Sequence, residues 1–333
     1  MNITLPWDQA GWRDTVDDWI TAQLAQQKLT LAGPISPVQQ RAWSAVLRVP
    51  AAEGSLYFKA SAPVLGHEPG LLQALTRWYP DVLPEVLAAE PAQGWLLMRD
   101  GGVTLCSLVK SMTDLDHWRA ILPLYARLQQ AMIPYAGDLL ELGVLDRRLC
   151  SLPEQVDRLL EDRAALLIDQ PDGLTSAEYE RLRVLLPEYA AMCKRLADYG
   201  IPETLHHEDF HDANIFVNNG RYTFADWGES GVAHPFFTLL VTLRSIACRL
   251  DLASDGPEML ALRDVYLEAW PNYGSLADLR TAADLAARVA MPARALTWYR
   301  VLAAVPETQR LEDASAVPGW LQEFLWYHRR IVE

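Results

Sequence analysis

The residues most able to do chemistry lie close together in the segment 207–228. Its first part, 207–214, reads His-Glu-Asp-Phe-His-Asp-Ala-Asn, and its last part, 226–228, reads Asp-Trp-Gly. Carboxylate and amide oxygens are the hard donors that Mg²⁺ accepts beside substrate phosphates. These residue types would suit a Mg²⁺ site beside phosphate groups, and the carboxylate of Asp209 lies close to them in the sequence.

A β-hairpin is predicted between these two parts. Residues 215–218 and 221–224 are apolar, β-prone runs joined by Asn-Gly at 219–220, the preferred two-residue turn because both positions need positive φ. The turn returns Asn214 and Asp226 to the same open end of the hairpin. Because neighbouring positions on a flat ladder point to opposite faces, the chain must bend out of the ladder there if both side chains are to share a cation.

Two regions of different pattern contain this segment. The first hundred residues mix short β-prone runs with two amphipathic helical patterns, and the remainder is mostly helical. In the first region we expect helices at 12–27 and 69–78, a break at 33–37, and strands at 41–49, 55–60, 84–89 and 95–98. In the second region we expect helices at 105–168, 176–199 (interrupted at Pro187), 236–250, 258–270, 276–304 and 319–331.

These patterns predict an α+β architecture in two lobes. A small N-terminal antiparallel sheet lobe with an N-terminal helix would span 1–100, and a large helical C-terminal lobe would span 105–333. The flexible run Asp-Gly-Gly at 100–102 marks the hinge, which we place at 101–104.

Composition narrows the class of protein. A chain of 333 residues with 50% hydrophobic content can bury a sizeable core, and a formal net charge of −14 argues against a nucleic-acid partner. A cationic acceptor would suit that charge, although many soluble proteins are simply acidic, which is the favoured explanation. No leader or membrane-spanning stretch is visible, which predicts a cytoplasmic protein without a membrane partner. Four scattered cysteines are expected to be reduced and mostly buried: Cys106, Cys150, Cys193 and Cys248.

The chain resembles the aminoglycoside phosphotransferase and choline kinase group, small-molecule kinases with a protein-kinase-like fold. Members typically carry a His-Gly-Asp-x-His-x-x-Asn loop and a later Asp-Trp pair, and this chain shows both in modified form at 207–214 and 226–228. The resemblance implies that Asp209 positions the acceptor hydroxyl and takes its proton, with His207 supporting the loop. It also implies that Asn214 and Asp226 are the Mg²⁺ ligands.

The same resemblance implies an ATP site in the N-terminal lobe. Lys59, on an apolar strand, resembles the lysine that contacts the α- and β-phosphates, and Glu68 resembles the glutamate that pairs with it. The adenine would then meet backbone groups from Met98 to Asp100. Ser44 stands where a phosphate-binding loop is expected, and a phosphate contact and a plain strand position are equally favoured.

Three positions depart from the group's pattern. Glu208 replaces the loop glycine, and we expect its side chain to face solvent; raising the pKa of Asp209 or binding part of the acceptor are the alternatives. His234 and Thr238 stand where the group often has aspartates. The usual carboxylate support of the catalytic loop is therefore altered.

The leading hypothesis is an ATP-dependent phosphotransferase that moves the γ-phosphate of MgATP to a hydroxyl of a small molecule, such as an aminoglycoside, an amino alcohol or a sugar. The alternative is a nucleotide-binding regulator with weak catalysis, which the three departures keep open. The sequence indicates neither the acceptor nor an oligomeric state. Six aromatic residues could wall an acceptor pocket, although their helical spacing is more typical of core: Trp298, Tyr299, Trp320, Phe324, Trp326 and Tyr327.

Overall fold

The computed structural model describes residues 4–306 and 313–332, which form an α+β protein with two compact units. Unit 1 holds the described residues up to Leu105, the segment Ala213–Gly228 and a short piece that begins at Ala303. Unit 2 holds Cys106–Asp212, Glu229–Leu302 and the described residues from 313 onward. The hairpin segment, which lies within the predicted helical lobe along the sequence, thus groups with the N-terminal sheet.

Unit 1 is built on a five-stranded antiparallel sheet with the strand order β1-β2-β3-β5-β4. The strands are β1 (Ser36–Gln40), β2 (Ser44–Ala51), β3 (Gly54–Ser61), β4 (Val86–Glu90) and β5 (Trp95–Arg99). The two central strands, β2 and β3, pair along their whole length because both alternate small or polar residues with large apolar ones. Four of these strands were predicted from the sequence, with ends that differ by a few residues.

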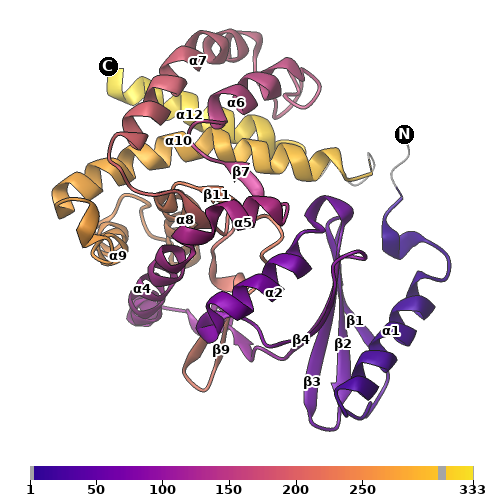
Figure 1. Cartoon of the computed structure of the whole chain (residues 1–333). Helices are drawn as coiled ribbons and strands as arrows, with labels where there is room; N and C mark the ends of the chain where they lie inside the picture. The colour runs from indigo at the N-terminus through magenta and orange to yellow at the C-terminus, as the bar shows by residue number, and fades with distance from the viewer. Residues whose placement is uncertain (1–3, 307–312, 333) are drawn as a thin grey trace. The chain divides into compact units, whose positions relative to one another are not determined.

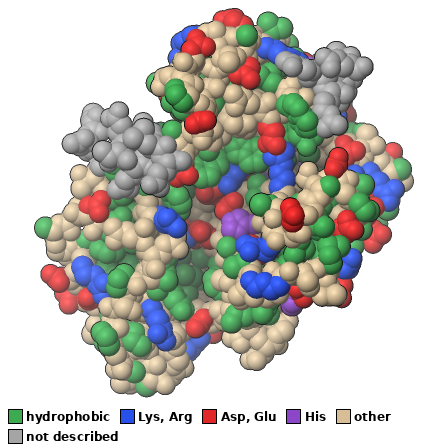
Figure 2. All heavy atoms as spheres, turned by 180° about the vertical axis from the view of Figure 1, so that it is seen from behind, with side chains coloured by type: hydrophobic (Ala, Val, Ile, Leu, Met, Phe, Trp, Pro, Cys, Tyr) green, Lys and Arg blue, Asp and Glu red, His purple; other side chains and the backbone are tan. Residues whose placement is uncertain are grey.

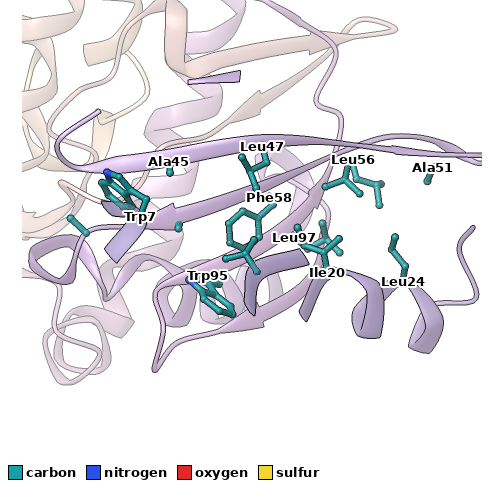
Figure 3. Close-up of a cluster of buried hydrophobic side chains, with 14 of the residues drawn as sticks. Trp7, Ile20, Leu24, Ala45, Leu47, Ala51, Leu56, Phe58, Trp95 and Leu97 are labelled. Carbon is teal, nitrogen blue, oxygen red and sulfur yellow. The ribbon is translucent and has the colours of Figure 1, made fainter. Parts of the chain in front are cut away.

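Two helices cover opposite faces of this sheet, α1 (Trp12–Gln26) and α2 (Glu68–Trp78) (Figure 1). Phe58 points toward α1 and joins the hydrophobic cluster drawn in Figure 3. Because side chains alternate along a strand, Lys59 points to the other face, where α2 begins with Glu68. Pro69 occupies the first turn of α2, a position that suits proline because its missing N–H is not needed there.

A second, three-stranded sheet in unit 1 contains the predicted hairpin. It pairs β9 (Ile215–Asn218) with β10 (Arg221–Phe224) and with the short β6 (Val103–Thr104). Arg221 lies opposite Asn218, and both turn residues have positive φ, 50° at Asn219 and 78° at Gly220. The Asn-Gly turn therefore sets the register that the sequence predicts.

Unit 2 is mostly helical, with one small mixed sheet. Its helices of ten residues or more are α4 (Leu115–Met132), α6 (Leu152–Glu161), α7 (Ser176–Ala197), α8 (Thr238–Leu250), α9 (Pro257–Leu267), α10 (Leu276–Ala303) and α12 (Ala316–Val332); two shorter ones are α3 (Leu105–Leu108) and α5 (Ala136–Glu141). The central strand β11 (Gly231–Ala233) runs parallel to β7 (Leu145–Arg147) and antiparallel to β8 (Thr204–His206). Strands β8 and β11 of this sheet lie on either side of the 207–228 segment in the sequence.

Several predicted elements were wrong. The break at 33–37 overlaps the edge strand β1, which tolerates Pro37 because an edge strand need not donate every N–H. The helical patterns at 105–168 form several helices, but the strand β7 that interrupts them was not predicted. Pro187 does not interrupt α7, because buried Leu182 and Tyr189 continue one apolar stripe past it.

The surface carries charges of both signs. On the face shown in Figure 2, acidic and basic side chains alternate with neutral and hydrophobic ones. Cys193 is buried, but Cys150 and Cys248 are exposed, so the expectation of mostly buried thiols was wrong. Within the described ranges, the helices are all too short or too polar to cross a membrane.

Candidate functional site

A cavity of about 520 Å³ opens in unit 1, between the five-stranded sheet and the hairpin segment. It gathers residues that lie far apart in the sequence, from β1 to the residue after β10. Seven of the predicted site residues line it: Ser44, Lys59, Glu68, Met98, Asp100, Asn214 and Asp226. The structure thus brings the predicted nucleotide and metal residues to one cavity.

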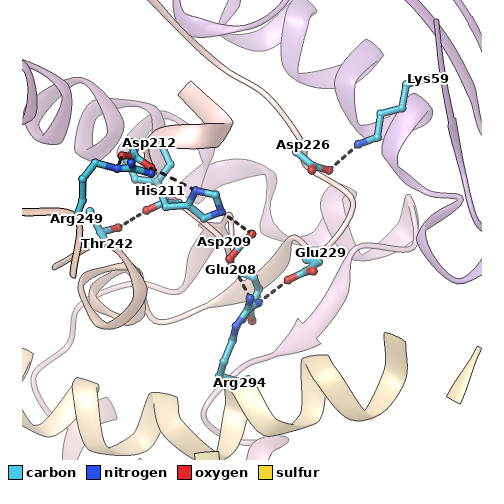
Figure 4. Close-up of polar contacts among 11 residues, drawn as sticks. Lys59, Glu208, Asp209, His211, Asp212, Asp226, Glu229, Thr242, Arg249 and Arg294 are labelled. Carbon is cyan, nitrogen blue, oxygen red and sulfur yellow. Dashed lines mark hydrogen bonds and ion pairs between the residues drawn. The ribbon is translucent and has the colours of Figure 1, made fainter. Parts of the chain in front are cut away.

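Lys59 is the centre of an ion-pair triad with Glu68 and Asp226 at this cavity, and Figure 4 shows its contact with Asp226. Its Nζ lies 2.6 Å from Oδ1 of Asp226 and 2.7 Å from a carboxylate oxygen of Glu68. Burial alone would lower the pKa of Lys59, but the two carboxylates outweigh it and raise that pKa above its ordinary value. The ammonium is therefore charged at any physiological pH.

Glu68 fixes this triad to three elements of unit 1. Its side chain is 1% exposed, and its oxygens also accept hydrogen bonds from Ser61 Oγ on β3, at 2.7 Å, and from the backbone N–H of Trp227, at 2.9 Å. A buried carboxylate is stable only when its lone pairs are satisfied in this way. Glu68 therefore holds Lys59 and the segment that follows Asp226 in fixed positions.

The bend that the sequence requires at the hairpin end is present at Asp226. The backbone N–H of Ala225 still donates to the carbonyl of Asn214, at 2.9 Å, but Asp226 has φ 66° and leaves the ladder. Its side chain is about half exposed and lines the cavity together with Asn214. A Cβ atom at Gly228 would lie 3.3 Å from Leu65 and 3.5 Å from a Glu68 oxygen, so the third residue of Asp-Trp-Gly is closely packed.

The predicted hinge is a close crossing of two chain segments. A Cβ atom at Gly102 would lie 2.4 Å from the Val217 carbonyl oxygen, and one at Gly101 would lie 3.0 Å from Phe216. Gly102 also has φ 95°, and its N–H donates to Asp100 Oδ1 at 2.9 Å. The Asp-Gly-Gly sequence is thus explained by the close approach to β9, within unit 1.

In unit 2, the loop after β8 presents Asp209 with both carboxylate oxygens engaged. Arg294 Nη2 donates to Oδ1 at 2.9 Å, and His211 Nε2 lies 3.0 Å from Oδ2. Burial would raise the pKa of Asp209, but Arg294 and then His211 outweigh it and hold that pKa well below its usual range. Asp209 is therefore ionised at all pH values at which the protein would be assayed.

Arg294 was missed by the sequence analysis. It lies on α10, its side chain is 7% exposed, and it also bonds Glu229, the residue directly after Asp-Trp-Gly (Figure 4). The signal was a single cation in the apolar run Ala-Met-Pro-Ala-Arg-Ala-Leu at 290–296. A lone charge inside a buried helical stripe indicates a buried carboxylate partner elsewhere in the chain.

Glu208 does not face solvent, which contradicts the sequence expectation. Its side chain is 3% exposed and faces two buried arginines, Arg147 on β7 and Arg294. Burial raises the pKa of Glu208 to about 7, against the opposing effect of these arginines. Its φ of 69° lies in the left-handed region, where the glycine of the usual motif would be unstrained.

Uncharged hydroxyls support the loop in place of the missing aspartates. Tyr125 Oη accepts from the backbone N–H of His207 at 2.9 Å, and Thr242 Oγ1 donates to the carbonyl of Phe210 at 2.7 Å. His234 and Thr238 are both buried behind the loop. Burial lowers the pKa of His234 to about 3, so it is neutral there.

The six aromatic residues do not wall one pocket in the part of the chain that the structure describes. Phe324 is buried against Tyr189, whereas Trp326 is half exposed. The ring centroid of Trp298 lies 5.7 Å from the guanidinium carbon of Arg294, which contacts Asp209. Phe324 is therefore a helix-packing residue, as its spacing in the sequence favours.

The structure is similar to solved structures of small-molecule kinases. A choline kinase from Cryptosporidium parvum Iowa II matches with a TM-score of 0.61 at 9% identity, covering 95% of this chain and 96% of that one. A choline/ethanolamine kinase family protein from Mesorhizobium loti gives 0.57 at 17% identity, covering 92% and 93%. A spectinomycin phosphotransferase, solved with ADP and spectinomycin, gives 0.50 at 11% identity, covering 92% and 97%. At these identities the matches show a shared fold.

Comparison with curated proteins by sequence returned no match. The model of one protein family, described as the phosphotransferase enzyme family, matches residues 37–279, which is well over half of the chain. The matched range contains the Lys59–Glu68–Asp226 triad and the whole 207–228 segment. On this match, and with the protein-kinase-like α+β fold, the chain belongs to the phosphotransferase enzyme family.

Proposed function

We propose that this phosphotransferase moves the γ-phosphate of MgATP to a hydroxyl of a small molecule. The observation that carries the proposal is the Lys59–Glu68–Asp226 triad at the wall of a cavity large enough for a nucleotide. A buried lysine held by a helix glutamate is the arrangement that phosphoryl-transfer enzymes of the protein-kinase type need for the phosphates.

The nucleotide would use residues of unit 1, which we propose as the nucleotide-binding part of the chain, with 1–100 as its main portion and 101–104 as its connection. Lys59 would meet the α- and β-phosphates, and Ser44 lies on the same cavity wall. Met98 and Asp100 also line the cavity, on β5 and just after it, and their backbone would meet the adenine.

The residues at the hairpin end fit a magnesium ion. Asn214 and Asp226 offer an amide and a carboxylate oxygen to the same cavity, and the backbone bond from Ala225 to Asn214 holds their segments together. Mg²⁺ takes such hard oxygen donors together with substrate phosphates, and when bound it would offset the charge that develops on the phosphates. Asp226 also pairs with Lys59, which brings the proposed metal ligand next to the proposed phosphate-binding lysine.

The acceptor would be handled by the loop in unit 2. Asp209 would hold the acceptor hydroxyl in line and take its proton as the new bond forms, with His207 as part of the support of the loop. A carboxylate with a low pKa is a weak base, which suits a loose transition state where alignment matters more than basicity. The contacts that hold Asp209 thus favour catalysis by positioning of the acceptor hydroxyl.

We propose a hydroxylated amine as the acceptor class. Glu208, Asp209 and Glu229 contact the guanidinium of Arg294, and Glu208 also faces Arg147, so this region holds three carboxyl groups against two guanidinium groups. A cationic acceptor would offset that excess. The similarity in fold to a choline kinase and to a spectinomycin phosphotransferase supports this proposal. A nucleic-acid or membrane partner forms no part of the proposal, and an ATP-using enzyme with reduced thiols would work in the cytoplasm.

The regulator hypothesis is not favoured by a specific observation. The departures that suggested it, Glu208, His234 and Thr238, are all accommodated in the buried structure of unit 2.

The test of the proposed function is ATP consumption against a panel of amino alcohols, aminoglycosides and sugars, with and without Mg²⁺, and with mass-spectrometric detection of the phosphorylated product. GTP in parallel tests the nucleotide preference. Metal-dependent nucleotide binding without any product across the panel, and with slow hydrolysis only, would favour the regulator.

A further inference from the structure

Arg294 occupies a position that the proposed reaction does not yet explain. Its Nη2 donates to Asp209 Oδ1 at 2.9 Å, and its Nη1 bonds Glu229 and lies 3.9 Å from a Glu208 oxygen. The guanidinium also lies 5.7 Å from the ring centroid of Trp298, one turn further along α10. These contacts, all within unit 2, fix the orientation of the Arg294 guanidinium.

The contact with Asp209 is directional. The two oxygens of the carboxylate are held by different groups, Oδ1 by Arg294 and Oδ2 by His211. These two contacts restrain the carboxylate plane to one orientation. Glu229, which anchors the other guanidinium nitrogen, follows Asp226-Trp227-Gly228 directly in the chain. Arg294 therefore joins the catalytic loop to the first residue after the proposed metal-ligand motif.

We propose that Arg294 is a positioning residue for Asp209, which sets the orientation of the carboxylate against the acceptor hydroxyl and couples it to Glu229. The inference rests on the proposed function, since it assigns Asp209 to the acceptor. Arg294 does not touch the substrate in this scheme. It acts through the carboxylate, whose misalignment by a small distance is enough to lower the transfer rate.

A purely structural role is the weaker explanation for this residue. Burying one arginine among Glu208, Asp209 and Glu229 costs desolvation of every charge, and apolar groups of similar volume at such sites are often as stable or more so. Elsewhere on α10, Arg280 donates two hydrogen bonds to Asp264 at the surface, where an Arg–Asp pair carries little desolvation cost. The buried contact between Arg294 and Asp209 therefore requires an explanation other than stability.

The test compares Arg294→Met with Arg280→Met, a matched change on the same helix that removes an Arg–Asp pair away from the loop. Arg294→Met should lower kcat roughly 10²-fold while the KM for MgATP stays within about twofold, because alignment is lost and the nucleotide is untouched. Arg280→Met should leave both constants near wild type. Arg294→Lys, which keeps the charge and loses the fork, should be intermediate.

A pH profile separates positioning from a general loss of structure. The charged and titratable groups that face Asp209 are His207, Glu208 and His211 from its own loop, Arg294 from α10, and Glu229 through Arg294. Without Arg294 the buried carboxylate loses its main cation, so the pKa of Asp209 rises and kcat falls as pH is lowered through the new value. A structural defect alone would lower kcat equally at every pH.

Two further measurements make each outcome decisive. Carboxyl-carbon NMR of labelled Asp209 reports its pKa without any turnover, and added guanidinium ion should partly restore the rate of an Arg294→Ala variant. If Arg294→Met folds poorly, the Arg294→Met/Glu208→Gln double variant removes one of the unpaired carboxylates and is measured instead. An unchanged Asp209 pKa with an unchanged kcat overturns the proposal. An upward pKa shift in a protein that phosphorylates nothing leaves the Arg294–Asp209 coupling intact and refutes the proposed function.

Discussion

The ammonium of Lys59 and the carboxylate of Asp226 lie 2.6 Å apart, although 167 positions separate them in the sequence. Both belong to unit 1, where β3 supplies the lysine and the residue after β10 supplies the aspartate. The lysine thus pairs with the aspartate that we assign to the metal. Binding of MgATP would replace this contact, with the phosphates taking Lys59 and the metal taking Asp226.

The first prediction concerns Asp226→Ala. If Asp226 holds Mg²⁺, the affinity for ATP should rise with Mg²⁺ in the wild type and should no longer respond to it in the variant, because the carboxylate that recruits the metal is gone. Isothermal calorimetry with and without Mg²⁺ measures this directly. Asp17→Ala, at a surface ion pair on α1, is the control and should bind as the wild type does. Equal Mg²⁺-dependent affinity in both variants would count against the metal assignment.

The second prediction concerns Lys59→Met. The substitution leaves Glu68, which is 1% exposed, without its buried cation, and breaking such a pair costs about 3–5 kcal/mol of unfolding free energy. Urea unfolding should show this loss for unit 1, and phosphoryl transfer should be lost as well. The double variant Lys59→Met/Glu68→Gln should recover much of the stability and none of the activity. Recovery of both would mean that Lys59 has a structural role alone.

The parts of the site that the sequence predicted rest on local signals. The Asn-Gly turn sets the hairpin register by itself, and Lys59 and Glu68 are nine positions apart on a strand and the helix that follows it. The environment of Asp209 could not be predicted in this way, because Arg294 lies 85 positions away on a helix whose pattern reads as continuous core. The burial of Glu208 depends on Arg147 and Arg294 together, and a carboxylate is placed at the surface by default when its cations are unknown.

The third prediction is a pH dependence of stability that arises at Glu208. Burial raises its pKa from 4.5 to about 7. Between pH 4.5 and about 7, the folded protein therefore keeps a proton on this carboxyl group that the unfolded chain has released. Stability contributed by this group is therefore full below pH 4.5 and is lost as pH rises toward 7, by up to about 3 kcal/mol. Glu208→Gln, which mimics the protonated form, should lack this loss.

The measurement is urea unfolding of the wild type and of Glu208→Gln at several pH values from 5 to 8. The difference between the two proteins isolates Glu208 from the other titrating groups, and it should change in favour of the variant as pH increases. A difference that is constant across this range would show that Glu208 titrates at an ordinary pKa, as an exposed carboxylate does.

The last prediction concerns Asp209→Asn. If Asp209 positions and deprotonates the acceptor, the variant should bind MgATP nearly as well as the wild type, because the nucleotide residues all belong to unit 1. Transfer should fall by 10²-fold to about 10⁴-fold, the combined contribution of alignment and general-base help. The fold should survive the change, since the amide oxygen can still accept from Arg294, and Glu208 and Glu229 still face that guanidinium.

Asp212→Asn is the matched control for this change. Asp212 lies three positions further along the same loop and is paired with Arg249, so its substitution perturbs the loop without removing the acceptor carboxylate. Its transfer rate should exceed that of Asp209→Asn by at least about tenfold. A larger loss at Asp212 than at Asp209 would reverse the assignment of the catalytic carboxylate. Equal, wild-type-like rates in both variants would place the proton transfer elsewhere, because neither Asp209 nor Asp212 would then be required.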